Sequence, residues 1–171
     1  QGPMVLFPLL VRAQGGGLEA ISQMWLIMLA LEVPLVFYLG AGVRRIGPRG
    51  VIAIGIVAAA LRWSVSGFVD DLRWVYVAQA LHGVTVFGVV LGAPVYVDAV
   101  VPARLRSTGQ GLLGMIGVSL GSILSNLCAG WLVENVGPRA PARIAGVFAT
   151  GLALALPWLL PSVRPPAERG L

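Results

Sequence analysis

The chain has 171 residues, of which 57% are hydrophobic and 11% are charged, and its mean hydropathy is +0.88. A soluble domain of this length needs more charge to cover its surface, so the composition excludes an ordinary water-soluble protein. The net charge of +5 is carried by arginine alone, because the sequence contains no lysine. In so apolar a chain we interpret this charge as a determinant of membrane orientation, and we expect no nucleic-acid partner.

Long apolar segments follow one another along the chain. A helix needs about 20 residues to cross about 30 Å of hydrocarbon. The predicted full spans are residues 21-42, 50-69, 74-98, 107-133 and 143-161. Residues 1-13 are too short to span, and we interpret them as the tail of a helix whose start is missing. The predicted fold class is all-α, a polytopic transmembrane helical bundle with one partial and five full helices.

Arginine is unevenly distributed between the two sets of alternate loops. One set, with the tail 162-171, carries seven arginines, and the opposite set carries four. The first group is Arg44, Arg45, Arg49, Arg104, Arg106, Arg164 and Arg169, and the second is Arg12, Arg73, Arg139 and Arg143. Cytoplasmic loops of membrane proteins carry the excess of positive charge. The pattern therefore predicts that the first set of loops and the C-terminus are cytoplasmic.

Small residues recur at intervals that allow membrane helices to approach closely. Gly88 and Gly92 form one such pair, and Gly117, Gly121 and Ser125 form a stripe with a four-residue period. We expect both groups to pack against neighbouring helices. The single cysteine, Cys128, excludes an intrachain disulfide and a cysteine metal cluster, and it is expected to serve packing.

Three ionisable residues lie inside successive predicted spans. Counting 1.5 Å per residue from the same membrane face places Glu32, Arg62 and His82 all roughly 10–17 Å deep, close to the midplane. Gln79 precedes His82 by three residues and so shares its helix face. Charges at this depth are costly and usually face a cavity or a substrate path. A structural Glu32–Arg62 ion pair and a hydrogen-bonded core histidine are the alternative explanations.

The segments "LEVPLVFYLGAGVRRIGPRG", "ALRW", "QALHGVTVFGVVLGAPVYVDAVVPARLRSTGQGLLG" and "GVSLGSILSNLCAGWLVENVG" occur in this order. The chain resembles the C-terminal half of a major facilitator superfamily transporter, in the branch that holds lactose permease, nucleoside–proton symporters and the phenylpropionate permease. The resemblance covers the whole chain. A loop with Gly42, Arg45, Gly47 and Arg49 is similar to a family loop motif, although the usual aspartate is absent and Arg44 stands nearby.

The "VDAVVPARLRSTGQ" segment contains the most specific match, the run from Pro102 to Gln110. The resemblance implies that this segment and the glycine–arginine loop belong to a gating or loop motif. The residues of this segment that we assign to the motif are Asp98, Arg104, Arg106 and Gln110.

The resemblance also implies roles inside the spans. Glu32 matches an acidic residue of helix eight that takes part in substrate binding and coupling, Arg62 matches an arginine of helix nine, and His82 matches a histidine of the proton and sugar site. Where lactose permease has an acidic residue three positions beyond that histidine, this chain has Thr85. The proton pathway of lactose permease is therefore not copied one to one in this chain. If this half carries a proton, Glu32 is the better candidate for the carrier.

The predicted function is secondary active transport, as proton-coupled symport of a nucleoside, a sugar or an aromatic acid. The predicted substrate and proton site is Glu32, Arg62, Gln79 and His82, without metal or other cofactor. Its expected partners are the solute, the proton, the lipid bilayer and a missing N-terminal half of the same chain. The alternatives are a membrane scaffold and an intramembrane enzyme, and the latter lacks an H-E-x-x-H or G-x-S-x-G motif.

Overall fold

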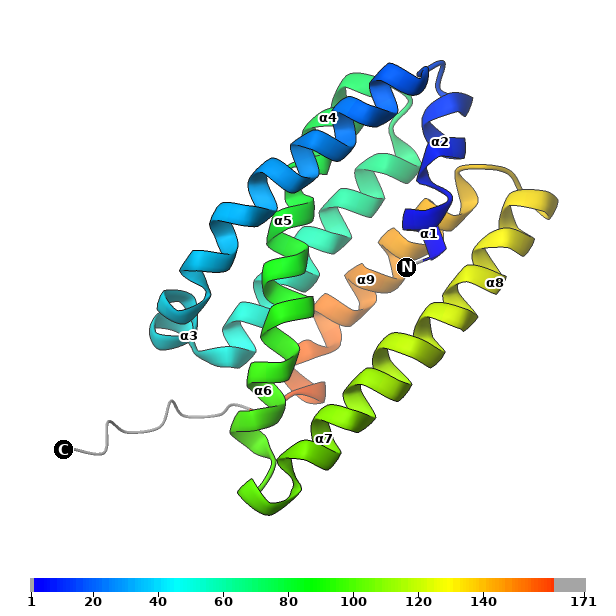
Figure 1. Cartoon of the computed structure of the whole chain (residues 1–171). Coiled ribbons are helices and arrows are strands. Elements are labelled where there is room, and N and C mark those ends of the chain that lie inside the picture. The colour runs from blue at the N-terminus through cyan, green and yellow to red at the C-terminus, as the bar shows by residue number, and fades with distance from the viewer. Residues whose placement is uncertain (1, 162–171) are drawn as a thin grey trace.

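The computed structural model describes residues 2–161, apart from the side chains of residues 39 and 40. Within this range every regular element is a helix, and five helical segments are long and apolar enough to cross a membrane. Figure 1 shows them as a bundle of roughly aligned rods. The predicted all-α transmembrane fold is confirmed. The predicted cytoplasmic tail, with Arg164 and Arg169, lies outside the described residues.

The bundle begins with two short helices and a long hairpin. Helices α1 (Gly2–Val5) and α2 (Phe7–Ala13) are separated by a break at Leu6. Helix α3 (Leu18–Phe68) is really two antiparallel arms, because Gly47 inside it has non-helical dihedral angles with a φ of 72°. A positive φ strains any residue with a side chain, which explains glycine at this position. We call residues 18–46 the outgoing arm and residues 48–68 the returning arm.

Two further paths through the bundle are each built from several elements. The first consists of α4 (Leu72–Gln79), α5 (Leu81–Thr85), the π-helix η1 (Val86–Leu91) and α6 (Gly92–Val100). The second consists of η2 (Ala103–Leu105), α7 (Arg106–Leu112), the π-helix η3 (Leu113–Leu120) and α8 (Gly121–Asn135), and α9 (Ala140–Leu159) follows. Pro94 has no N–H to offer Val90, and the π-helix η1 lies directly before this irregularity.

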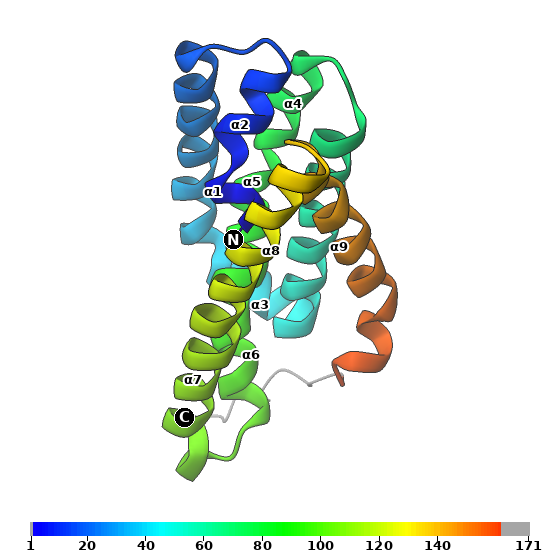
Figure 2. The ribbon, with the colours of Figure 1, turned by 90° about the vertical axis from the view of Figure 1, so that its right-hand side faces the viewer.

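The connections between helices gather at two opposite ends, as Figures 1 and 2 show. The turn of α3 at Gly47, the α6–α7 connection and the last turn of α9 lie at one end. This end holds the five arginines of the first loop set that lie within the described residues, so we call it the arginine-rich end. They are Arg44, Arg45, Arg49, Arg104 and Arg106. The α2–α3, α3–α4 and α8–α9 connections lie at the other end. The structure thus groups the loops as the sequence pattern predicts, while their orientation in the membrane stays a prediction.

Hydrogen bonds tie the connections together at the end opposite the arginine-rich one. Arg139 forms an ion pair with Asp70, and Arg143 donates to the carbonyl oxygen of Gly67 at 2.8 Å. The Gln14 amide donates to the carbonyl oxygen of Val69 at 3.1 Å. The hydrogen bond and the charge of Arg139 lower the pKa of the Asp70 carboxyl below its ordinary value. Three connections that are distant in sequence are therefore held side by side.

Apolar packing concentrates beside these tied connections. Buried residues of α2, the outgoing arm and α4 form one core cluster, which includes Phe7, Val11, Met24, Met28 and Val75. A smaller cluster of Ile52, Tyr96 and Leu156 lies toward the arginine-rich end. By contrast, the path from η2 to α8 is almost entirely exposed within the described residues.

Glycines permit the closest helix approach in the bundle. A Cβ added at Gly88 would lie 2.3 Å from the Cα of Gly55, so the returning arm and η1 touch backbone to backbone. The predicted close packing at Gly88 is therefore confirmed. The π-helical path buries this glycine even though its neighbours are only partly covered.

The small-residue stripe on the η3–α8 path behaves differently from the expectation. A Cβ at Gly117 would meet only Leu113, and one at Gly121 only the Ile116 oxygen, both in the same helical path. Only Ser125 of the stripe contacts another helix, since its Oγ accepts a 2.8 Å hydrogen bond from the Gly2 amide. Cys128 is exposed among the described residues, and its packing role stays a prediction. Spacing alone identified a stripe, but the helix turns most of it away from the described neighbours.

Replacement of Gly88 by leucine should therefore destabilise the protein. The side chain would overlap the Gly55 backbone, and overpacking of this kind costs about 1–3 kcal/mol. We expect Gly88→Leu to lower the melting temperature and the monodisperse yield in detergent. Gly151→Leu is the matched control, because a Cβ at Gly151 meets no atom within 4 Å. Equal stability of the two variants would contradict the close crossing.

Candidate functional site

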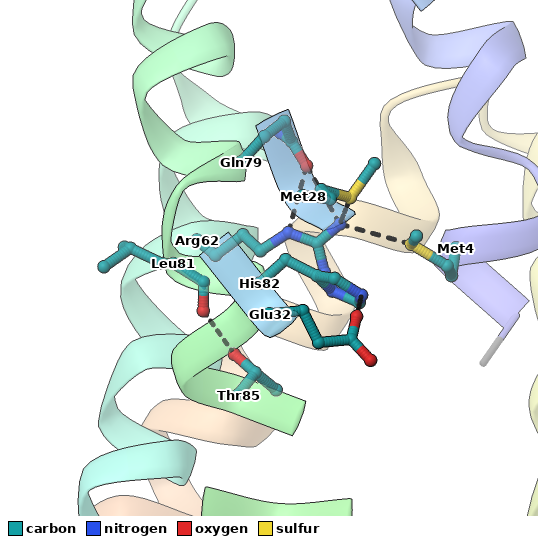
Figure 3. A network of polar contacts seen from close by, with 8 residues as sticks. All are labelled: Met4, Met28, Glu32, Arg62, Gln79, Leu81, His82 and Thr85. Carbon is teal, nitrogen blue, oxygen red and sulfur yellow. Dashed lines mark hydrogen bonds and ion pairs between the residues drawn. The ribbon is translucent and has the colours of Figure 1, made fainter. Parts of the chain in front are cut away.

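Polar side chains from four helical segments converge in the middle of the bundle. Glu32 comes from the outgoing arm, Arg62 from the returning arm, Gln79 from the end of α4 and His82 from α5. Figure 3 shows these residues around a common centre. The sequence predicted this convergence from the depths of the residues. Their roles in substrate or proton binding stay predictions.

A glycine allows α5 to lie directly against the outgoing arm. A Cβ at Gly83 would be 2.9 Å from the backbone nitrogen of Glu32, and Gly83 is buried. Because His82 precedes this glycine, the contact brings its ring beside Glu32. Ala80 joins α4 to α5 with helical dihedral angles (φ −57°, ψ −29°), so the helical backbone continues from Gln79 to His82. Both side chains belong to the group of residues in Figure 3.

Arg62 is the most deeply enclosed charge of this group, with 2% of its surface exposed. Its Nε and one terminal nitrogen, Nη2, donate to the Gln79 Oε1 at 3.0 and 2.9 Å. The same Nη2 approaches the sulfur atoms of Met4 at 3.2 Å and Met28 at 3.3 Å. The guanidinium also lies over the Trp63 ring, 4.4 Å from its centroid. Four neutral groups therefore surround this cation.

No carboxylate oxygen among the described residues lies within ion-pairing distance of Arg62. The structural Glu32–Arg62 ion pair considered from the sequence is therefore absent from this structure. Gln79 takes the place of the carboxylate, and its own amide donates to the Val75 carbonyl at 2.8 Å. Gln79 is completely buried, so its side chain is held by Arg62 on one side and by α4 on the other.

Glu32 instead lies beside His82. The His82 Nε2 and the Glu32 Oε2 are 3.6 Å apart, and 17% and 29% of the two side chains are exposed. This separation is too long for a direct hydrogen bond, so the two side chains lie side by side with a gap between them. The His82 Nδ1 is buried and has no hydrogen-bond partner among the described residues. The imidazole is thus enclosed at Nδ1, while both side chains keep some exposed surface.

The neighbourhood of this pair contains one polar group that does not join it. The Thr85 hydroxyl donates to the Leu81 carbonyl at 3.0 Å, within its own helical path. The resemblance described above aligns Thr85 with an acidic residue of lactose permease. In this chain the hydroxyl satisfies a backbone group, so Glu32 is the carboxylate beside His82.

Sequence reasoning did not identify the two methionines that contact Arg62. Met28 lies four residues before Glu32, which places both on one side of the outgoing arm, and this spacing was an available signal. Met4 belongs to α1, whose position against the rest of the bundle no sequence pattern indicated.

The residues of the predicted loop motifs lie at the arginine-rich end, apart from this network. Gly42, Arg45, Gly47 and Arg49 surround the turn of α3, and Arg49 donates to the Pro157 carbonyl at 3.2 Å. Gln110 joins α7 to α6, because its amide donates at 2.8 Å to both the Pro94 carbonyl and the Asp98 carboxylate. Arg104 and Arg106 are exposed. These contacts join helices at one end, and a gating role stays a prediction.

An apolar cavity of about 460 Å³ lies between the returning arm, α5, α8 and α9. Trp63 and Thr85 line its border with the polar network, and the rest of its wall is nearly all apolar. The described residues contain no group of three or more His, Cys, Asp or Glu side chains that could hold a metal ion. The titratable groups of Figure 3 are therefore the stronger candidate for a functional site.

Comparison with known proteins finds similarity to two proteins that are named as transporters. The chain matches the Putative nucleoside transporter YegT of Escherichia coli (strain K12) with 29% identity over 98 residues, 54% of this chain and 23% of that protein. It matches the Uncharacterized transporter YwbF of Bacillus subtilis (strain 168) with 22% identity over 151 residues, 88% of this chain and 38% of that protein. The chain thus spans well under half the length of these relatives. No solved structure matches it.

The family comparison covers most of the chain. The model of the family described as MFS_1 like matches residues 10–141. This range includes both arms of α3, the four residues Glu32, Arg62, Gln79 and His82, and the whole path from η2 to α8. The resemblance to the major facilitator superfamily is confirmed at this level, and the narrower branch with lactose permease stays a prediction. The sequence fits this family model over most of its length, and the described residues form helices that include five candidate spans, so the chain belongs to the MFS_1-like family.

Proposed function

We propose that this chain forms part of a secondary active transporter that couples the movement of a small polar or aromatic solute to that of a proton. The observation that carries the proposal is the Glu32–His82 pair. Two titratable side chains lie 3.6 Å apart within candidate membrane spans, and both are partly exposed. A charged group at the bilayer centre costs about 2.5–3.5 kcal/mol on insertion scales, so a function that needs the charge explains its presence.

The pair offers chemistry suited to both ligands. Glu32 accepts a proton or a hydrogen bond, and the His82 Nε2 can donate or accept, depending on its protonation state. A hydroxyl or amino group of a solute placed between them would bridge a gap that the two side chains do not close themselves. Solute binding and proton exchange would then compete for the same carboxylate, which is the simplest physical basis for coupling them.

This geometry and one relative favour one class of solute. A carboxylate and an imidazole bind hydroxyl groups well, which fits nucleosides and sugars. An aromatic acid would need a cationic partner, and the Arg62 guanidinium is 2% exposed and bound to Gln79. Since the name of the Escherichia coli relative describes it as a putative nucleoside transporter, a nucleoside is the first solute to test.

The site is proposed to be completed by further helices of the same kind, as an N-terminal half would supply. The path from η2 to α8 supports this idea, because it is long enough to span and yet nearly uncovered by the described residues. The greater length of the relatives supports it as well. Membership in the MFS_1-like family favours transport over the intramembrane enzyme and the membrane scaffold that the sequence left open.

Removal of the Glu32 charge should abolish coupled transport while sparing assembly. In membrane vesicles that hold the full-length protein, we expect Glu32→Gln to reduce nucleoside accumulation driven by a proton gradient to the background level. The amide keeps the shape of the side chain but cannot exchange a proton. Immunoblotting of the vesicles should show a normal membrane level.

Glu19→Gln is the matched control for this measurement. Glu19 is an exposed carboxylate in the first turn of the same helix, and its contact is with Gln23 and not with the network. A normal rate for Glu19→Gln beside a lost gradient response for Glu32→Gln supports the proposal. Full accumulation by Glu32→Gln, or by the double variant Glu32→Gln/Arg62→Gln, would show that the charges are structural.

The arginine-rich end is proposed to face the cytoplasm. Single cysteines at Arg45 and Arg104, in a Cys128→Ser background, should resist an impermeant maleimide applied to intact cells and react after the cells are opened. A cysteine at the exposed Asp71, at the opposite end, should react in intact cells. Labelling of the first two positions from outside would reverse the orientation.

A further inference from the structure

We propose that Gln79 is a positioning residue, which holds the Arg62 guanidinium away from Glu32 so that this carboxylate stays free. The proposal concerns a residue that the sequence placed among the solute and proton contacts. In the structure Gln79 has no exposed surface, so it cannot meet a solute in this conformation. Its influence on the site must therefore pass through the group that it binds, which is Arg62.

The geometry of Gln79 is that of a fixed acceptor. Its Oε1 accepts hydrogen bonds from two nitrogens of Arg62, at 3.0 and 2.9 Å. The two bonds fix one edge of the planar guanidinium. Its Nε2 donates to the Val75 carbonyl at 2.8 Å, one turn back along α4. This second bond orients the amide so that its oxygen, and not its nitrogen, faces the cation. Every strong hydrogen bond of Arg62 therefore goes to one rigidly placed oxygen.

The remaining contacts of Arg62 are too weak to perform this task alone. The Met4 and Met28 sulfurs are weak hydrogen-bond acceptors, and both methionine side chains are flexible. The Trp63 ring attracts the cation but does not fix its rotation about the side chain. Without Gln79, the guanidinium would have two thioethers and a ring face as partners in a place that water scarcely reaches.

A carboxylate is available on the other side of Arg62. Figure 3 shows Glu32 and His82 next to the guanidinium on the side away from Gln79. His82 lies 3.6 Å from Glu32, and Arg62 is the other titratable side chain that Figure 3 shows beside it. Opposite charges attract strongly in a poorly hydrated interior. A released guanidinium would therefore turn to Glu32 and form the ion pair that this structure lacks.

An ion pair between Arg62 and Glu32 would occupy the carboxylate that the proposed function needs. The inference rests on the proposed function in this one point. Its test does not measure transport, so the two can fail separately. A hydrophobic carbodiimide reacts with carboxylic acids in apolar surroundings, and a carboxylate held in an ion pair with arginine is protected. Mass spectrometry of the peptide that contains Glu32 reports the fraction modified.

We expect Gln79→Leu to reduce carbodiimide modification of Glu32 several-fold in the full-length protein in membranes. The added change Arg62→Met should restore modification to at least its original level, because the cation that protects Glu32 is then gone. Gln23→Leu is the matched control, since Gln23 is exposed and contacts Glu19 and Tyr76 instead of Arg62. It should leave the modification of Glu32 unchanged.

A purely structural role for Gln79 predicts a different pattern. In that case Gln79→Leu would leave Glu32 as reactive as before or more reactive, and Arg62→Met would not reverse any change. Either result would overturn the proposal. Should Gln79→Leu fail to reach the membrane, Gln79→Met keeps the volume of the side chain and replaces the amide oxygen by a weaker acceptor. We expect Gln79→Met also to reduce carbodiimide modification of Glu32. Unchanged modification in this variant would reject the proposal.

Discussion

A guanidinium that water scarcely reaches must find its partners inside the protein, and the centre of this bundle is arranged around that requirement. Arg62 is enclosed by side chains of α1, the outgoing arm and α4, and each supplies an acceptor to it. These partners are all neutral, so they stabilise the positive charge without neutralising it. The relative positions of four helical segments therefore depend on one cation.

The glycine contacts complement this polar arrangement. Gly83 lets α5 touch the outgoing arm at Glu32, and Gly88 lets η1 touch the returning arm at Gly55. Both glycines lie on the same path through the bundle, on either side of Thr85. They fix this path between the two arms of α3 by close backbone packing, which is the main source of helix association where there is no hydrophobic drive between helices. Polar groups then occupy the space that the glycines define.

The sequence predicted the helices and the meeting of Glu32, Arg62 and His82, because apolar length and residue depth are both read directly along the chain. It could not predict which of them pair. Pairing depends on how each helix is rotated about its axis, and the depth of a residue along the chain does not give that rotation. The contact of Met4 with Arg62 depends on the position of α1, for which the sequence has no clear pattern. The same limitation explains why Gly88 packs closely whereas Gly121, with equally suitable spacing, does not.

The burial of Arg62 also has a consequence for the order of assembly. The returning arm carries the arginine, while its strongest acceptor, Gln79, belongs to a helix that is synthesised later. Until α4 enters the bilayer and packs, the charge lacks the amide oxygen that holds it in the finished bundle. Membrane helices insert first and associate afterwards. The two arms of α3 are therefore in the bilayer with the unfavourable free energy of the Arg62 charge before Gln79 can contact it. Biogenesis must therefore tolerate an intermediate less well satisfied than the final protein.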